Sequence, residues 1–263
     1  MTKEIYLVTG ASDGIGAVYA DRLARRGHDL VLVARRADKL EALAEKIRRE
    51  HGVAVDILAA DLSQPDGLEK VESRLREDTG ITGLVNNAGI AGDGPITSLD
   101  TAHATGMIAL NVLAVTRLAA AIAPRLAATG KGTIINITSV TALMPAAFTA
   151  VYPATKAFVL AFTEALNAQL SPSGVRVQGV LPGITRTAIW ETETLDTIPA
   201  AMVMDVHDMV DAALAGLDLG EVLTIPSLPD VTALDALLAA RDALRPKLSL
   251  ARPAERYRLA SAT

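Results

Sequence analysis

The chain has 263 residues, of which 25 are basic, 30 are acidic and none is cysteine, so its net charge is −5. This balance gives no strong attraction to nucleic acid, and a chain without cysteine has no disulfide, thiolate nucleophile or cysteine metal site. No apolar run approaches the ~20 residues that span a bilayer, and no signal peptide precedes the first strand, so we expect a cytoplasmic protein without a membrane partner. The histidines lack metal-ligand spacing, so we expect no bound metal.

Short apolar runs alternate with helical patterns along most of the chain, without a linker or an internal repeat. The runs are continuously apolar, as in strands buried on both faces, so we expect an α/β fold with one parallel sheet between helices. Helices are predicted over Asp38–Arg49, about Ala104–Ala128 and Tyr152–Leu170. The predicted strands are Ile5–Val8, Leu30–Val33, Val53–Ala59, Leu84–Asn86, Thr133–Ile137, Val175–Val180 and Val222–Ile225.

The first strand leads into a glycine-rich turn, Thr9-Gly10-Ala11-Ser12-Asp13-Gly14-Ile15-Gly16, and then into a helical pattern. Glycine lets the backbone approach a pyrophosphate, and a helix N-terminus offers free N–H groups with a partial positive charge. The turn therefore indicates a dinucleotide site, although the strict G-x-G-x-x-G spacing is absent and a P-loop is excluded. A strand–helix turn that binds no ligand is the alternative.

The end of the second strand bears on the choice of cofactor. A site for NAD places a carboxylate there, whereas Ala34 is followed by Arg35 and Arg36. Guanidinium groups suit a phosphate, so we expect NADP(H) in preference to NAD(H), with Arg35 facing the 2′-phosphate and Ser12 as a hydroxyl partner. The acidic Asp13 in the glycine turn argues against a phosphate there. For Arg36, a side chain that is simply exposed to solvent is an equally good interpretation.

Tyr152-Pro153-Ala154-Thr155-Lys156 begins the helical pattern that follows Ser139, which lies 13 residues before Tyr152. Side chains at i and i+4 share a helix face, so Lys156 can hold a positive charge near the Tyr152 hydroxyl and favour the phenolate. A tyrosine whose pKa falls from about 10 toward neutrality can donate or accept a proton. Alone, this pattern is common by chance.

Taken in order, the glycine turn, Asn86-Asn87-Ala88-Gly89, Ser139 and Tyr152-x-x-x-Lys156 resemble the motifs of the short-chain dehydrogenase/reductase family, over roughly residues 3–226. The resemblance implies a doubly wound, seven-stranded Rossmann-type sheet in the order 3-2-1-4-5-6-7. It implies that Tyr152 is the general acid or base, that Ser139 binds the same substrate oxygen, and that Lys156 binds the nicotinamide ribose.

Asn111 resembles the fourth catalytic residue of the family, which connects Lys156 to solvent through water. An asparagine between Leu110 and Val112 is also costly to bury without hydrogen-bond partners, which independently indicates a polar role. A helix kink or cap is the alternative for this residue.

The resemblance also implies contacts to the cofactor along one edge of the sheet. Asp61 corresponds to an adenine contact, Asn87 to Gly89 to a turn below the adenosine ribose, and Pro182-Gly183-Ile184-Thr185-Arg186-Thr187 to contacts with the nicotinamide amide and a phosphate. The predicted cofactor-binding residues are Gly10, Ser12, Asp13, Gly14, Ile15, Gly16, Arg35, Arg36, Asp61, Leu62, Asn87, Ala88, Gly89, Tyr152, Lys156, Pro182, Gly183, Thr185 and Thr187.

Apolar residues near these motifs predict the substrate class. A pocket lined by methionine and aromatic side chains suits a neutral, hydrophobic ketone, aldehyde or secondary alcohol, although the same side chains could simply pack a loop down. Arg186 is the one candidate anchor for a carboxylate. The predicted lining is Leu143, Met144, Phe148, Ile189, Trp190, Leu195, Ile198, Met202, Val203 and Met204.

The last 37 residues, 227–263, form an extension that we assign to the same domain as residues 1–226. Asp230 is predicted to cap a helix with Leu234, Leu237 and Leu238 on its inner face, before a basic, proline-broken tail. The two long apolar helices of the main part suggest isologous pairing into a homodimer or homotetramer.

The leading hypothesis is an NADP(H)-dependent carbonyl reductase or alcohol dehydrogenase acting on a CH–OH group. One alternative is a non-catalytic protein that senses NAD(P)(H) and regulates a partner, and another is an NAD-linked alcohol dehydrogenase. The presence of Ser139, Tyr152 and Lys156 argues against the sensor, because a pure sensor needs no proton donor.

Overall fold

The computed structural model describes residues 4–92, 94–187 and 197–257 of the chain. They belong to two compact units, Met1–Pro226 and Ser227–Thr263. The division after Pro226 is the one at which the sequence analysis begins the C-terminal extension. Assignment of the extension to the same domain as the main unit stays a prediction.

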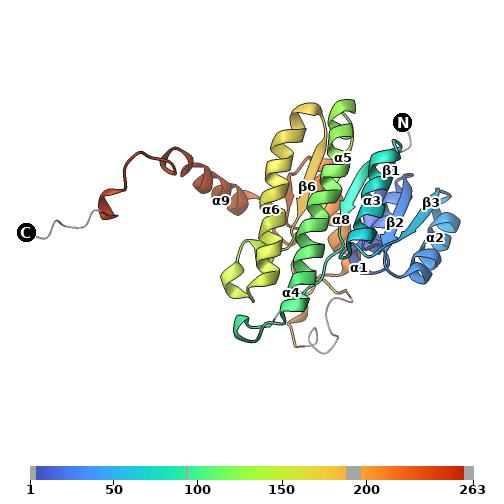
Figure 1. The fold of residues 1–263 in the computed structure, drawn as a ribbon, viewed down its shortest axis with the longest axis horizontal. Helices are drawn as coiled ribbons and strands as arrows, with labels where there is room; N and C mark the ends of the chain where they lie inside the picture. Colours follow the sequence, from blue (N-terminus) through green and yellow to red (C-terminus); the bar gives the residue numbers. More distant parts are fainter. Residues whose placement is uncertain (1–3, 93, 188–196, 258–263) are drawn as a thin grey trace, which may run out of the picture. The chain divides into compact units, whose positions relative to one another are not determined.

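The main unit is built on a seven-stranded sheet with the strand order β3-β2-β1-β4-β5-β6-β7, and every pairing is parallel (Figure 1). The expected order is therefore confirmed. The chain leaves β1 toward one edge of the sheet and β4 toward the other, which opens a crevice at their carboxyl ends. The strands are β1 (Ile5–Thr9), β2 (Asp29–Ala34), β3 (Val55–Ala59), β4 (Ile81–Asn86), β5 (Thr133–Ile137), β6 (Arg176–Val180) and β7 (Leu223–Thr224).

The largest differences from the predicted strands lie at the starts of β3 and β4. β3 begins at Val55, two residues after the predicted Val53. β4 begins at Ile81, three residues before the predicted Leu84, because Gly83 continues the strand although it adds no apolar side chain. The Tyr6 ring occupies the space in which a Cβ of Gly83 would lie, so only glycine fits there. β7 is shorter than predicted, with two residues.

Helices cover both faces of the sheet and enclose two hydrophobic cores. Successive residues of a strand point to opposite faces, so Tyr6 and Val8 lie in one core and Leu7 lies in the other. The first core is covered by α1 (Gly14–Arg25), α2 (Ala37–His51) and α8 (Val206–Leu219). The second core is covered by α3 (Pro65–Glu77), α5 (Val115–Thr129) and α6 (Val151–Leu170).

The longest helical stretch runs from Thr101 to Thr129 and comprises α4 (Thr101–Ile108), a π-helical turn (Ala109–Ala114) and α5. It has 29 residues, and the mean hydropathy of an 18-residue window within it is 1.8, so it is long and apolar enough to cross a membrane, contrary to the expectation that no segment would be. Leu118, Ile122 and Leu126 are fully buried against the sheet. Core helices of soluble proteins pass the same test, and packing on the sheet explains this composition.

The unit 227–263 contains α9 (Thr232–Asp242) and two single turns of 3-10 helix in its described part. Asp230 accepts a hydrogen bond from the Thr232 N–H at 2.8 Å, but the N-cap residue of α9 is Val231, so the predicted cap lies one residue before the cap position. The predicted inner face is only partly correct, because Leu234 is buried whereas Leu237 is 51% exposed.

Candidate active site

The glycine turn connects β1 to α1 and lies against the segment that follows β4. Gly10 and Gly14 have φ angles of 66° and 52°, in the left-handed region that favours glycine. A Cβ on Gly10 would lie 2.7 Å from Asn87 Nδ2, and a Cβ on Gly16 would overlap the Gly10 carbonyl. The turn therefore requires glycine both for its backbone conformation and for its close packing.

Thr9, which was not among the predicted site residues, connects the two segments. Its hydroxyl donates to the Val85 carbonyl at 3.1 Å and accepts from the N–H groups of Asn87 and Ala88 at 2.9 and 3.0 Å. The Asn87 side chain donates back to the Thr9 carbonyl at 2.9 Å. The predicted ribose turn and the glycine turn thus form one hydrogen-bonded structure.

Asn111 is buried in the π-helical turn, and its amide is bonded to two other segments. Oδ1 accepts from the Ile90 N–H at 3.0 Å, and Nδ2 donates to the Ile90 carbonyl at 2.9 Å and to Thr155 Oγ1 at 3.1 Å. The expected hydrogen-bond partners are therefore present, and Asn111 is not a cap, because it lies inside the π-helical turn. Its connection of Lys156 to solvent stays a prediction. Such π-helical turns are frequent at functional sites.

Lys156 lies in the crevice beside Asn111 and Tyr152. Its Nζ is 5.7 Å from the centroid of the Tyr152 ring and donates to the Ile137 carbonyl at 2.9 Å. A Cβ on Gly89 would lie 3.1 Å from Asn111 Oδ1 and 3.6 Å from Lys156 Nζ, so the three residues are neighbours. Burial disfavours the charged ammonium and lowers the pKa of Lys156 to about 8.

Ser139 follows the carboxyl end of β5, on the same side of the sheet. It is largely buried, and its hydroxyl oxygen accepts from the Thr141 N–H at 3.2 Å, so the O–H can still donate to a substrate oxygen. Thr138, the residue before it, donates to the Lys156 carbonyl at 2.7 Å. This bond attaches the strand end to the first turns of α6, which carry Tyr152 and Lys156.

Charged side chains gather at the predicted adenosine end of the site, where binding of a 2′-phosphate by Arg35 stays a prediction. Arg36 donates to Ser12 Oγ at 3.0 Å, so it is held at the glycine turn and is not simply solvated. Asp61 is shielded from water, which opposes its ionisation, but two hydrogen bonds from Ser63 and the charge of Arg35 outweigh this and keep the pKa of Asp61 low. Arg35 therefore acts on Asp61, and Arg36 is the arginine at Ser12.

The segment Pro182–Thr187 reaches the glycine turn, as its P-G-x-x-x-T pattern predicts. The Pro182 carbonyl accepts from the Val140 N–H at 3.0 Å, and Arg186 N donates to the Met204 carbonyl at 2.9 Å. A Cβ on Gly14 would lie 3.3 Å from Thr187, which places that side chain at the start of α1. Two other predicted cofactor contacts belong to the hydrophobic cores. Ile15 packs against the first core, and Leu62 lies within the second.

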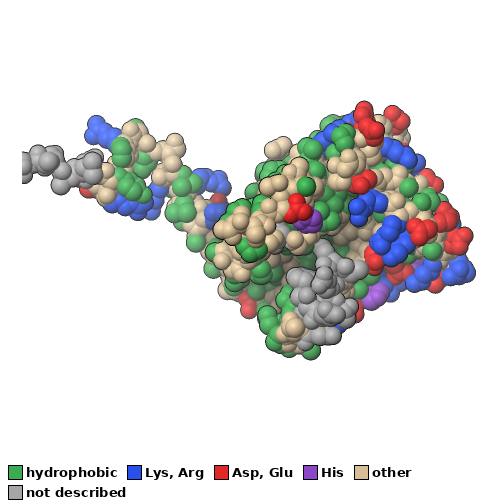
Figure 2. Space-filling model, turned by 60° about the horizontal axis from the view of Figure 1, so that its bottom comes forward, with side chains coloured by type: hydrophobic (Ala, Val, Ile, Leu, Met, Phe, Trp, Pro, Cys, Tyr) green, Lys and Arg blue, Asp and Glu red, His purple; other side chains and the backbone are tan. Residues whose placement is uncertain are grey.

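The expected apolar lining is only partly described. Met144, Phe148 and Met202 are 62%, 54% and 61% exposed, so these three do not serve to pack a loop down. Ile189, Trp190 and Leu195 lie outside the described residues. Figure 2 shows charged side chains gathered on the side of the main unit that carries α2 and β3, while hydrophobic and uncharged side chains dominate the other side.

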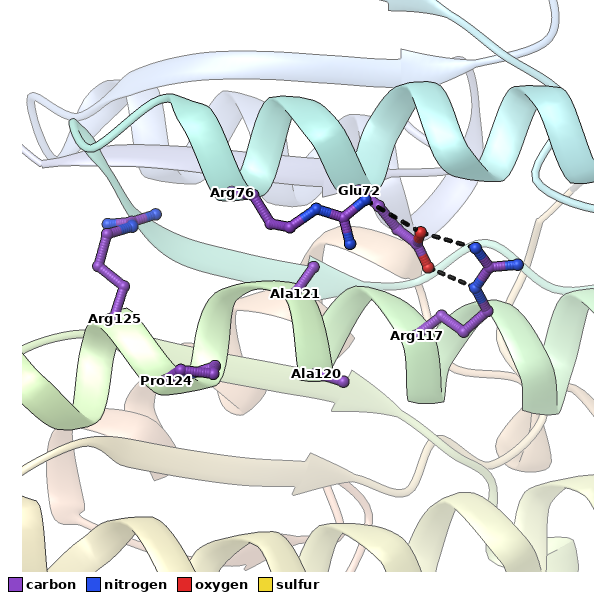
Figure 3. A pocket seen from close by; sticks show the side chains of 7 residues that line it. All are labelled: Glu72, Arg76, Arg117, Ala120, Ala121, Pro124 and Arg125. Atoms are coloured by element: carbon purple, nitrogen blue, oxygen red, sulfur yellow. Dashed lines mark hydrogen bonds and ion pairs between the residues drawn. The ribbon is translucent and has the colours of Figure 1, made fainter.

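Two hollows lie on the outer surface of the main unit, away from the predicted catalytic residues. The first, of about 490 Å³, lies between α3 and α5, where the buried Glu72 carboxylate accepts from Arg117 at 2.7 Å (Figure 3). It is lined by Glu72, Arg76, Arg117, Ala120, Ala121, Pro124 and Arg125. The second, of about 420 Å³, lies between α5 and α6. The predicted catalytic residues instead lie near the carboxyl ends of the strands, where open α/β sheets bind ligands.

A group of potential metal ligands lies on the outside of α1 and α2. Donor atoms of Asp21, Glu50 and His51 all lie within 4.8 Å of one another. Asp21 already accepts from Arg22 at 2.7 Å and lies 2.9 Å from His51 Nε2, so ion pairing accounts for this group. The expectation of no metal stays a prediction.

Comparisons with known proteins agree with this geometry. The sequence model of a family described as short chain dehydrogenase matches residues 4–197. The chain is 37% identical over 187 residues to very-long-chain 3-oxoacyl-CoA reductase-A of Danio rerio, covering 69% of this chain and 58% of that protein. The chain thus spans about three fifths of the length of that relative.

Two solved structures are similar over nearly the whole chain. A short-chain dehydrogenase from Sphingobium yanoikuyae in complex with NADPH is 50% identical with a TM-score of 0.93, covering 97% of this chain and 100% of that one. A bulky-bulky ketone specific alcohol dehydrogenase from Comamonas testosteroni is 45% identical with a TM-score of 0.91, covering 98% and 99%.

Proposed function

The chain belongs to the short-chain dehydrogenase/reductase family of oxidoreductases, and on that premise we propose that it uses NADPH to reduce a bulky, apolar ketone to a secondary alcohol, or catalyses the reverse. The observation that carries the proposal is the grouping of Ser139, Tyr152, Lys156 and Asn111 at the strand ends beside the glycine turn. This grouping provides a proton donor, a hydrogen-bond donor for the substrate oxygen and a buried cation.

The residues of the crevice fit a dinucleotide. The glycine turn ends at the N-terminus of α1, whose partial positive charge suits a pyrophosphate. The buried Lys156 ammonium has three N–H donors, one of which bonds to the Ile137 carbonyl. The others suit the hydroxyl groups of a ribose. When bound, NADPH supplies the hydride that adds to the carbonyl carbon.

Proton transfer is assigned to Tyr152. As the carbonyl carbon receives the hydride, the Tyr152 O–H gives its proton to the carbonyl oxygen, which becomes the alcohol. Ser139 donates a hydrogen bond to the same oxygen and fixes its position. Lys156, with a pKa of about 8, is mostly protonated at neutral pH, so its positive charge stabilises the phenolate that remains.

The substrate class is proposed from exposed apolar side chains, two of which follow Ser139 within nine residues of the chain. Met144, Phe148 and Met202 expose large apolar side chains, and the relative that is 45% identical is specific for bulky-bulky ketones. The resemblance to a very-long-chain 3-oxoacyl-CoA reductase supports a second candidate, the reduction of a 3-oxoacyl thioester. Both candidates use the same proton donor. They differ in the group attached to the carbonyl, which is apolar in the ketone and carries a thioester in the second candidate.

A substrate panel tests the proposal. Oxidation of NADPH is measured with diaryl and long-chain dialkyl ketones and with 3-oxoacyl-CoA esters, and kcat/KM is expected to be higher for the ketones. A higher value for the thioesters would favour the second candidate. Binding of NADPH without turnover of any carbonyl would favour the sensor alternative, and a preference for NADH would favour the NAD-linked enzyme.

Arg36 is expected to determine the preference for NADPH over NADH. Because it is bonded to Ser12 at the glycine turn, Arg36→Ala should lower kcat/KM for NADPH about 10–100-fold, the effect of losing a charge-assisted hydrogen bond. The value for NADH should change much less. Arg49→Ala, which makes the same change at an exposed position in the last turn of α2, is the matched control. An equal loss with both cofactors in the Arg36 variant would contradict this assignment.

We also propose that two copies pair through the outer face of α5 and α6. The hollow there is lined by small and apolar side chains, including Ala120, Ala123 and Ala127, and Phe158, which is 41% exposed, stacks on Phe162 at 6.0 Å. Small residues let helices approach closely, which supports an isologous contact. A cytoplasmic location is part of the proposal and is supported by the absence of cysteine.

A further inference from the structure

Four polar side chains from two segments, the glycine turn and the start of α2, lie close together. Arg36 NH2 lies 3.0 Å from Ser12 Oγ and 3.7 Å from Asp13 Oδ2, and Lys39 Nζ lies 3.5 Å from the same carboxylate oxygen. Lys39 comes from the first turns of α2 and was not predicted as a site residue. One carboxylate therefore lies between two cations at the place where a 2′-phosphate is expected.

Asp13 is held in this place by the backbone. Its Oδ1 accepts from the Gly14 N–H at 2.8 Å, which caps the start of α1 and leaves Oδ2 directed at the two cations. Its side chain is 45% exposed, and those of Arg36 and Lys39 are 49% and 46% exposed. Ion pairs that are half-exposed to water contribute little net stabilisation, so a doubly charged phosphate can replace the carboxylate as their partner.

We propose that Asp13 is a built-in competitor of the 2′-phosphate of NADPH, and that Lys39 is a further residue that determines cofactor specificity. In the protein without cofactor, Asp13 holds Arg36 and Lys39 at the glycine turn. When NADPH binds, both cations turn to its phosphate, and the nearby carboxylate repels that phosphate. Asp13 therefore weakens the binding of NADPH and NADP⁺ and favours release of the oxidised cofactor. This inference rests on the proposed function.

The arrangement resolves the conflict between an acidic residue in the turn and a preference for NADPH. The two cations and the carboxylate leave a net charge of +1 in the cluster, which still attracts a phosphate. Removing the carboxylate charge would double that net charge without removing a phosphate ligand. The effect should be confined to nucleotides that carry a 2′-phosphate, since NADH presents only hydroxyl groups there.

Calorimetric titration of the full chain with 2′,5′-ADP and with 5′-AMP isolates the phosphate in question. Asp13→Asn keeps an acceptor for the Gly14 N–H and removes the charge, so it should tighten binding of 2′,5′-ADP about three- to tenfold. Lys39→Ala should weaken that binding by a similar factor. Neither variant should change the Kd for 5′-AMP more than about twofold. Glu45→Gln and Lys46→Ala, which make the same charge changes further along α2, are the controls.

The outcomes separate this inference from the proposed function. A wild-type chain that binds 2′,5′-ADP no better than 5′-AMP would overturn the NADPH preference, and the role of Asp13 with it. If the wild type discriminates, an unchanged or weaker affinity of Asp13→Asn for 2′,5′-ADP would overturn the competitor role alone. Equal tightening for both nucleotides would also overturn it, because Asp13 would then act on the phosphate that they share.

Discussion

Tyr152→Phe is expected to lower kcat by about 10²–10⁴-fold, the usual contribution of a positioned general acid, while the Kd for NADPH changes little. The substitution removes only the hydroxyl and leaves a ring that fits beside Lys156, whose Nζ lies 5.7 Å from the ring centroid. Turnover is measured with the best ketone of the panel, and NADPH binding is measured by fluorescence titration.

A second tyrosine provides the matched control for this variant. Tyr19 is fully buried in α1, and its hydroxyl has no hydrogen-bond partner among the described residues. Tyr19→Phe makes the same chemical change away from the crevice and should leave kcat unchanged. A Tyr152→Phe enzyme that keeps more than about a tenth of the wild-type kcat would show that another group donates the proton.

Lys156→Met is expected to abolish turnover and, at the same time, to stabilise the folded protein at neutral pH. Burial lowers the pKa of Lys156 from 10.5 to about 8, so holding the charged form in the folded state costs on the order of 3 kcal/mol. Methionine has a similar length, carries no charge and removes this cost. Loss of the hydrogen bond to the Ile137 carbonyl offsets part of the gain.

The pH dependence identifies the cause of that stabilisation. Below pH 8 the cost of the buried charge is fully present in the wild type. Between pH 8 and 10.5 the unfolded chain binds more protons than the folded one, so wild-type stability from this group rises with pH. Urea unfolding at several pH values should therefore show the advantage of Lys156→Met shrinking across this window. A variant that is less stable at pH 7, by an amount independent of pH, would contradict the assignment.

Much of the fold could be predicted because its signals are local or belong to ordered motifs. The apolar run at Thr133–Ile137 coincides with β5, and Tyr152–Leu170 coincides with α6 to within one residue. The strand order came from the family resemblance, since periodicity carries no information on which strands pair. β4 was predicted too short because the reason for Gly83, the Tyr6 ring beside it, lies in another strand.

Site residues that belong to a sequence motif could be predicted. Residues whose role depends on contacts with distant parts of the chain could not. Tyr152, Lys156 and Asn111 do meet, and their contacts explain why each residue type is needed. The role of Thr9 depends on groups 76 to 79 residues away along the chain, so no local pattern could reveal it. Lys39 was missed for the same reason, because its connection to Asp13 exists only once α2 packs beside the glycine turn.

The bonds made by Thr9 and Asn87 have a consequence for the kinds of dinucleotide that the protein can accept. They tie the turn expected to hold the pyrophosphate to the segment that ends at Gly89, next to Lys156. We therefore expect the distance between the pyrophosphate site and the ribose site to be fixed by these bonds. A dinucleotide analogue with a triphosphate in place of the diphosphate bridge should then bind more weakly than NADPH, because its two ends would be too far apart.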